Sequence, residues 1–180
     1  MIQAAAFAAW LGAAVIVLSD GRRGLAHGLA LIAVAFTILA WAGGEHLAAA
    51  AILIGGGVAA IQRSRTGPDV WGLMPPGSTS RLVLSIAGGL LALWVSTSVM
   101  TGPGAELSFA ALSVLGLMGA RILTESEHAG AVLTALVALA LSVAMASGLA
   151  DAGRGPAPYV VAGLIAFGVS LIRVAEPNAA

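Results

Sequence analysis

Long apolar stretches alternate with short polar breaks along the whole chain. Seven stretches can be followed, at residues 2–18, 25–42, 46–62, 82–101, 105–122, 129–149 and 157–173. A helix needs about 20 apolar residues to cross a bilayer core of about 30 Å. The pattern therefore predicts an all-α integral membrane protein, a bundle of about seven transmembrane helices that forms one domain over residues 1–180.

The composition supports a membrane protein and excludes several functions. Hydrophobic residues make up 59% of the chain and charged residues 9%, against about 25% charged in soluble domains. The formal net charge is zero, so a nucleic-acid partner is not expected. There is no cysteine, which excludes disulfides, thiolate metal sites and cysteine nucleophiles.

The distribution of arginine predicts the orientation. The connections between the apolar stretches are numbered from the N-terminus. The even-numbered connections contain a single arginine, Arg154, which lies between the sixth and seventh stretches. The other seven arginines belong to the first, third and fifth connections and the C-terminal tail, and are Arg22, Arg23, Arg63, Arg65, Arg81, Arg121 and Arg173. Positive charge concentrates in cytoplasmic loops. We therefore expect an external N-terminus and a cytoplasmic C-terminus in the inner membrane of a bacterium, whose GC-rich genome would also explain the abundant alanine and glycine.

Small residues recur at four-residue spacing in several predicted helices. Close approach of such residues is a main source of helix association in lipid. Gly55 lies at the centre of the stripe from Ala51 to Ala59, and Gly116 pairs with Ala120. Tight helix contacts at Gly55 and Gly116 are one interpretation, and the general abundance of alanine is the other.

One internal similarity suggests a repeat. Residues 43–61, shifted by 61 positions, match residues 104–122 at seven of nineteen positions, whereas composition alone would give roughly two or three matches. A duplicated helical hairpin, comprising the second and third helices and then the fourth and fifth, would explain the match. Five of the seven matches are alanine or glycine, so chance remains the alternative.

The ionisable residues lie almost entirely at the ends of the predicted helices. Ion-coupled carriers and proton pumps need charges at membrane depth, and no predicted helix has one near its middle. His27 and His128 both begin helices on the cytoplasmic side. They are interpreted as interfacial polar residues, not as haem or metal ligands, because ligands would lie deeper. We therefore expect no cofactor and no bound metal.

Hydroxyl residues gather in the outer half of the fourth predicted helix, at Ser96, Thr97, Ser98 and Thr101. They are candidates for the wall of a polar path. The alternative is that the hydroxyl groups bond back to carbonyls of their own helix. No acid or histidine is adjacent to activate a serine, and Trp10, in the middle of the first helix, is expected to face lipid or a partner.

The longest polar stretch is QRSRTGPDVWGLMPPGSTSR, residues 62–81. It is predicted as the third loop, on the cytoplasmic side. Trp71 and Met74 form a short apolar patch within it, too short to cross a membrane. This patch is either a docking site for a partner subunit or a lip that dips into the lipid head groups.

The residues favour a non-catalytic accessory or structural subunit of a larger membrane complex. Its expected partners are membrane lipids and either other membrane subunits or a second copy of the chain. The alternative is a small-solute or lipid transporter, with a path between the repeated hairpins lined by Ser and Thr of the fourth and fifth helices. An enzyme is not expected, since no catalytic constellation is present.

Overall fold

The chain is helical throughout the part that the structure describes. The computed structural model describes residues 1–66, 71–73, 78–99, 104–124, 128–150 and 155–172. Its helices are α1 (Ile2–Leu18), α2 (Arg22–Ala42), α3 (His46–Arg65), α4 (Thr79–Val99), α5 (Ala105–Thr124), α6 (Ala129–Ala150) and α7 (Ala157–Ser170). Each corresponds to one predicted apolar stretch, so the prediction of an all-α protein is confirmed.

Helix length separates two groups. Helices α2 to α6 are long and apolar enough to cross a membrane, whereas α1 and α7 are apolar but shorter. The 14 residues of α7 give a helix of about 21 Å, less than the thickness of a bilayer core of about 30 Å. Five long apolar helices indicate a membrane-embedded protein.

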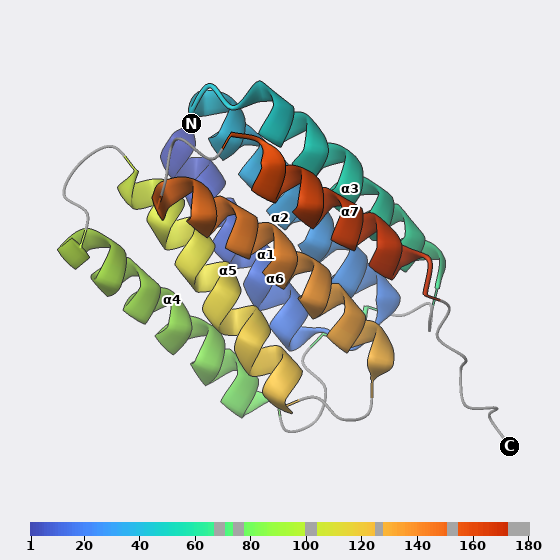
Figure 1. Ribbon diagram of the computed structural model, residues 1–180. Coiled ribbons are helices and arrows are strands. Elements are labelled where there is room, and N and C mark those ends of the chain that lie inside the picture. The colour runs from blue at the N-terminus through green and yellow to red at the C-terminus, as the bar shows by residue number, and fades with distance from the viewer. Residues whose placement is uncertain (67–70, 74–77, 100–103, 125–127, 151–154, 173–180) are drawn as a thin grey trace, which may run out of the picture.

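The helices form two layers (Figure 1). Helices α4, α5, α6 and α7 lie side by side in one layer, and α1, α2 and α3 lie side by side in the other. Between the layers, α1 packs on α4, α5 and α6, α2 packs on α6, and α3 packs on α6 and α7. Helix α4 lies at the edge of its layer, and its flanking contacts are with α5 and α1.

Small residues allow the helices to approach closely. A Cβ atom placed at Gly12 of α1 would lie 2.7 Å from the carbonyl oxygen of Gly28 in α2, and one at Gly28 would lie 2.8 Å from that of Gly12. These two glycines therefore set the crossing of α1 and α2. Helix α4 turns its small residues inward in the same way, because Ser85, Gly89, Ala92 and Ser96 are all buried.

The two hairpins of the predicted repeat are not neighbours. Helix α1 contacts both α2 and α5, and α6 contacts α2, α3 and α5, so α1 and α6 lie between the α2–α3 and α4–α5 hairpins. The two hairpins therefore do not pack against each other, and the path proposed between them stays a prediction. Gly44 and Gly104 make their turns with φ of +83° and +112°, yet the sequence match aligns Gly104 with Gly43. The duplication itself stays a prediction.

Candidate functional site

A large groove lies between α1, α4 and α5. Its volume is about 490 Å³. Helix α1 contributes one wall and α4 the other, and the start of α5 closes one end. The lining residues are Gln3, Phe7, Trp10, Ile86, Gly89, Leu90, Leu93, Ser96, Thr97, Ala105, Glu106 and Phe109. Most of these side chains are apolar, so the groove suits a hydrophobic ligand.

Trp10 joins the two walls of the groove. Its indole Nε1 donates a hydrogen bond to the carbonyl oxygen of Ser85 in α4, at 3.2 Å. Gly89 makes room for the ring, because a Cβ at that position would overlap the indole nitrogen. The ring of Phe7 lies 5.1 Å from that of Trp10, centroid to centroid. Trp10 thus packs against α4 and, being only partly buried, also lines the groove; the expectation that it faces lipid or a partner stays a prediction.

The polar groups of the groove gather at one end. Gln3 lies near the start of α1 and Glu106 in the first turn of α5, at the end of the bundle where α4 is connected to α5 (Figure 1). A carboxylate in the first turn of a helix is stabilised by the helix dipole. The described residues include no recorded ion pair for Glu106. The groove thus has an apolar body and an anionic end.

Two of the four predicted path residues line this groove. Ser96 donates its hydroxyl hydrogen to the carbonyl oxygen of Leu93 at 3.0 Å, and Thr97 donates to the same oxygen at 2.9 Å. The hydroxyls therefore bond back to their own helix, as membrane helices commonly allow. Ser98 is exposed and is not among the lining residues, and Thr101 lies outside the described residues.

A charge cluster holds the opposite end of the bundle together. Arg121 of α5, 1% exposed, donates to the carboxylate of Asp20 at 2.5 Å and to the carbonyl oxygen of Ser19 at 3.2 Å. Arg81 of α4 donates to the same carboxylate at 2.9 Å. The cluster ties the α1–α2 turn to α4 and α5. Sequence reasoning missed it, although Arg81 and Arg121 were both expected on one side.

The candidate docking residue Trp71 packs on its own chain. Its ring stacks on the ring of His27, with centroids 4.9 Å apart. The amide of Asp20 donates to the carbonyl oxygen of Gly72 at 3.1 Å, so this part of the loop lies against the α1–α2 turn. Trp71 keeps 46% of its surface exposed, and Met74 lies outside the described residues.

The two glycines predicted to mediate helix packing differ in their surroundings. A Cβ at Gly55 of α3 would lie 2.7 Å from both Cα and the carbonyl oxygen of Gly163 in α7, so this is a close helix contact. Gly116 is exposed, and a Cβ there would meet nothing within 4 Å. Gly116 thus has no neighbouring helix within the described part of the chain, and a packing role for it stays a prediction.

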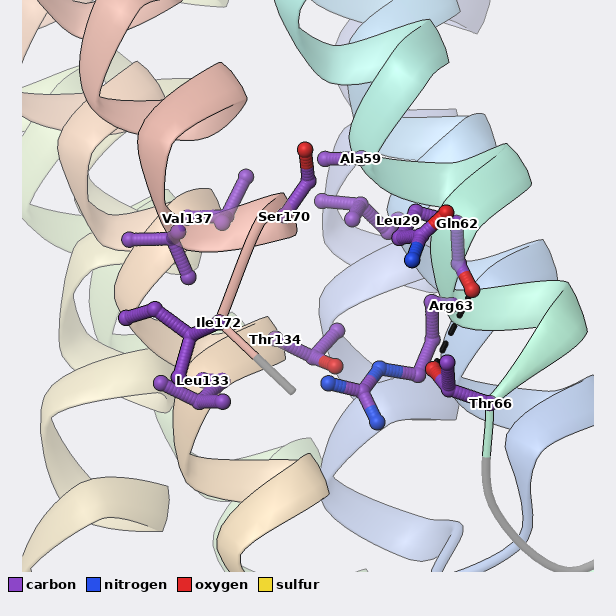
Figure 2. Close-up of a pocket in the computed structure, with 11 residues that line it drawn as sticks. Leu29, Ala59, Gln62, Arg63, Thr66, Leu133, Thr134, Val137, Ser170 and Ile172 are labelled. Carbon is purple, nitrogen blue, oxygen red and sulfur yellow. Dashed lines mark hydrogen bonds between the residues drawn. The ribbon is translucent and has the colours of Figure 1, made fainter. Parts of the chain in front are cut away.

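A second, much smaller pocket lies between α3, α6 and α7 (Figure 2). Its volume is about 20 Å³, and Arg63, Thr66, Thr134 and Ser170 supply polar groups to its lining. Sequence reasoning used Arg63 as an orientation signal and, if residues 62–81 form a lip, placed the arginines of that stretch near lipid phosphates. The hydrophobic side chains around it, including Leu29, Leu133 and Val137, come from helices that are distant in sequence.

The histidines do not meet. His27 lies against Trp71, and its Nδ1 atom is 2.6 Å from the carbonyl oxygen of Arg23. His46 packs on Trp41, with ring centroids 4.3 Å apart. His128 is exposed at the start of α6. The contacts recorded for His27 and His46 are with aromatic rings and, for His27, the backbone.

Comparison with protein-family models, curated proteins and solved structures finds no match for this chain. A proposal for its function therefore rests on the geometry of the groove, the Asp20 charge cluster and the Arg63 pocket alone.

Proposed function

We propose that this chain is a multi-pass membrane protein that binds an amphipathic, lipid-like molecule in the groove between α1, α4 and α5. The supporting observation is an apolar groove of about 490 Å³ with a carboxylate at one end. Pockets for small organic ligands measure about 300–1,000 Å³. An apolar tail would lie against Phe7, Trp10 and Leu90, and the head group would lie near Glu106.

The exposure of the lining side chains supports entry from the lipid. Phe7 is 56% exposed, Leu90 62% and Leu93 49%, so the groove is accessible from the outside of the bundle without separating any helices. In a bilayer, that outside surface is occupied by acyl chains. A ligand that moves laterally from the membrane would exchange one apolar environment for another, so the affinity would come from shape and from the polar end.

The charge of that end favours a particular head group. Glu106 is the acidic group of the groove, and Gln3 adds an amide that donates and accepts. A cationic or zwitterionic head group would pair with the carboxylate, and an anionic one would be repelled. In the orientation proposed from the arginines, this end faces away from the cytoplasm, in the inner membrane of a bacterium.

A photoreactive probe tests the groove. The probe is a single alkyl chain with a diazirine group and a quaternary ammonium head, added to purified protein in nanodiscs. We expect mass spectrometry to find labels on residues that line the groove. Leu90→Trp should greatly reduce labelling, because the larger side chain fills the groove. Leu91→Trp is the matched control, since Leu91 is also 62% exposed on α4 but does not line the groove.

The same labelling experiment also tests whether Glu106 binds a cationic head group. Glu106→Gln should weaken labelling by the ammonium probe and leave labelling by a neutral probe of the same chain unchanged. Equal labelling of Leu90→Trp and Leu91→Trp would contradict binding in the groove.

A role as an accessory or structural subunit is the second candidate. The observation that favours it is Trp71, which leaves 46% of its surface exposed beside the α1–α2 turn and is of the type that anchors protein interfaces. Affinity purification at native expression separates the candidates: a subunit would bring a partner in fixed stoichiometry, whereas a lipid-binding protein would purify with lipid and without such a partner.

A further inference from the structure

Arg63 lies near the end of α3 and reaches across to α6. Its guanidinium group lies over the first turn of α6, where a Cβ at Gly130 would be 2.6 Å from Nη1. Figure 2 shows the side chain extending from α3 towards Thr134. The residue is only partly exposed. A glycine at position 130 therefore gives the guanidinium its place between the helices.

No hydrogen bond or ion pair is recorded for this guanidinium within the described part of the chain. The nearby hydroxyl groups already donate to their own helices. Thr134 donates to the carbonyl oxygen of Gly130 at 2.7 Å, Ser170 to that of Phe167 at 2.6 Å, and Thr66 to that of Gln62 at 3.1 Å. The pocket thus holds a partly buried cation for which the structure records no anion.

The position of the cation makes an anion favourable. The N-terminal end of a helix carries a partial positive charge, and Arg63 lies beside that end of α6. Two positive groups in a partly apolar site repel each other, and a guanidinium removed from water is costly without a partner. A bound anion would neutralise both groups. Arginine is well suited to this, since its planar fork matches the oxygens of a phosphate.

The size and lining of the pocket indicate which anion fits. A volume of about 20 Å³ accommodates about one water-sized group, so a single oxygen can enter while the rest of the ligand stays outside. Leu133 and Ile172 also line the pocket and keep part of their surface exposed, and such side chains suit acyl chains. Basic pockets between transmembrane helices are known binding sites for lipid phosphates.

We propose that Arg63 binds a phosphate oxygen of an anionic phospholipid at the end of the bundle between α3, α6 and α7. The lipid head group would lie at the mouth of the pocket and its acyl chains would pass along α6 and α7. This site is separate from the groove between α1, α4 and α5, and either proposal can fail without the other.

Thermal unfolding of the detergent-purified chain tests the site. Phosphatidylglycerol, phosphatidylcholine with the same acyl chains, and inorganic phosphate are added separately. We expect phosphatidylglycerol to raise the Tm of the natural chain more than phosphatidylcholine does, because a ligand of the folded state stabilises it. Arg63→Gln should lose this difference. Arg65→Gln is the matched control, because Arg65 is exposed at the end of the same helix, and it should keep the difference.

A conservative variant and the outcomes that would overturn the proposal complete the test of the Arg63 site. Arg63→Lys keeps the charge but lacks the planar fork, so it should retain a smaller difference between the two lipids; this variant serves if Arg63→Gln does not fold. An equal lipid difference in Arg63→Gln and the natural chain would overturn the site. A rise in Tm with inorganic phosphate as large as that with phosphatidylglycerol would overturn the lipid as its ligand.

Discussion

At the scale of single residues, the ion pair between Arg121 and Asp20 is expected to stabilise the fold. A guanidinium that is 1% exposed needs compensating acceptors, and the Asp20 carboxylate and Ser19 carbonyl oxygen provide them. Asp20→Asn removes the negative charge and keeps the shape. We expect it to lower the free energy of unfolding by about 3 kcal/mol, the lower end of the range for breaking a buried pair, because the Ser19 contact remains.

Chemical unfolding in detergent measures this effect. Glu45→Gln is the control, since Glu45 is exposed and its side chain makes no cap hydrogen bond to α3. Its free energy of unfolding should stay within about 0.5 kcal/mol of the natural value. Equal losses in the two variants would contradict the structural role of Asp20.

Contacts between single residues also show what could not be predicted from the sequence. The arginine pattern grouped Arg81 and Arg121 on one side of the membrane. The pattern did not predict that both arginines bind the carboxylate of Asp20, because Asp20 is 61 positions from Arg81 and 101 positions from Arg121 in the sequence. The contact of Trp10 with α4 escaped sequence reasoning for the same reason: it depends on Gly89, and no local pattern connects residues so far apart.

At the scale of helices, Gly55 and Gly116 test how close packing stabilises the bundle. Gly55→Leu would force α3 away from α7, since even a Cβ would come within 2.7 Å of Gly163. We expect a loss of about 1–3 kcal/mol in the free energy of unfolding, as for other overpacked contacts. Gly116→Leu should leave stability unchanged or raise it by up to about 1 kcal/mol, because leucine favours helices and the position is open.

Thermal unfolding of Gly55→Leu and Gly116→Leu, measured under the same conditions, tests both expectations. A similar fall in Tm for both would show that Gly116 also packs against something, such as a second copy of the chain. An unchanged Tm for Gly55→Leu would contradict the close contact of α3 and α7.

The apolar pattern of the sequence predicted where the helices are, but it did not predict which helices pack against one another. All seven helices were predicted, because length and apolar content suffice in a chain with so few charges. Four-residue spacing alone could not separate Gly55 from Gly116, since both belong to small-residue stripes and only the tertiary arrangement supplies a partner helix to one of them.

At the scale of the whole molecule, the structure brings the described arginines to one end. Arg81 and Arg121 meet at Asp20, which follows α1 and precedes Arg22 and Arg23. Arg63 lies over the start of α6, and Arg65 is two residues further along α3. Among the described residues, six arginines lie at one end of the molecule and Glu106 lies at the other. The orientation expected from the arginines depends on this distribution.

Reporter fusions test that orientation and the number of spans. We expect reporters after residues 24, 68 and 180 to be cytoplasmic and those after 44, 103 and 154 to be periplasmic, because arginine-rich ends are retained in the cytoplasm. Helices α1 and α7 are the critical elements, since both are shorter than the other five. Reporters after 154 and 180 on the same side would mean that α7 does not cross. A cytoplasmic N-terminus would mean that α1 does not, and the count of seven would be wrong.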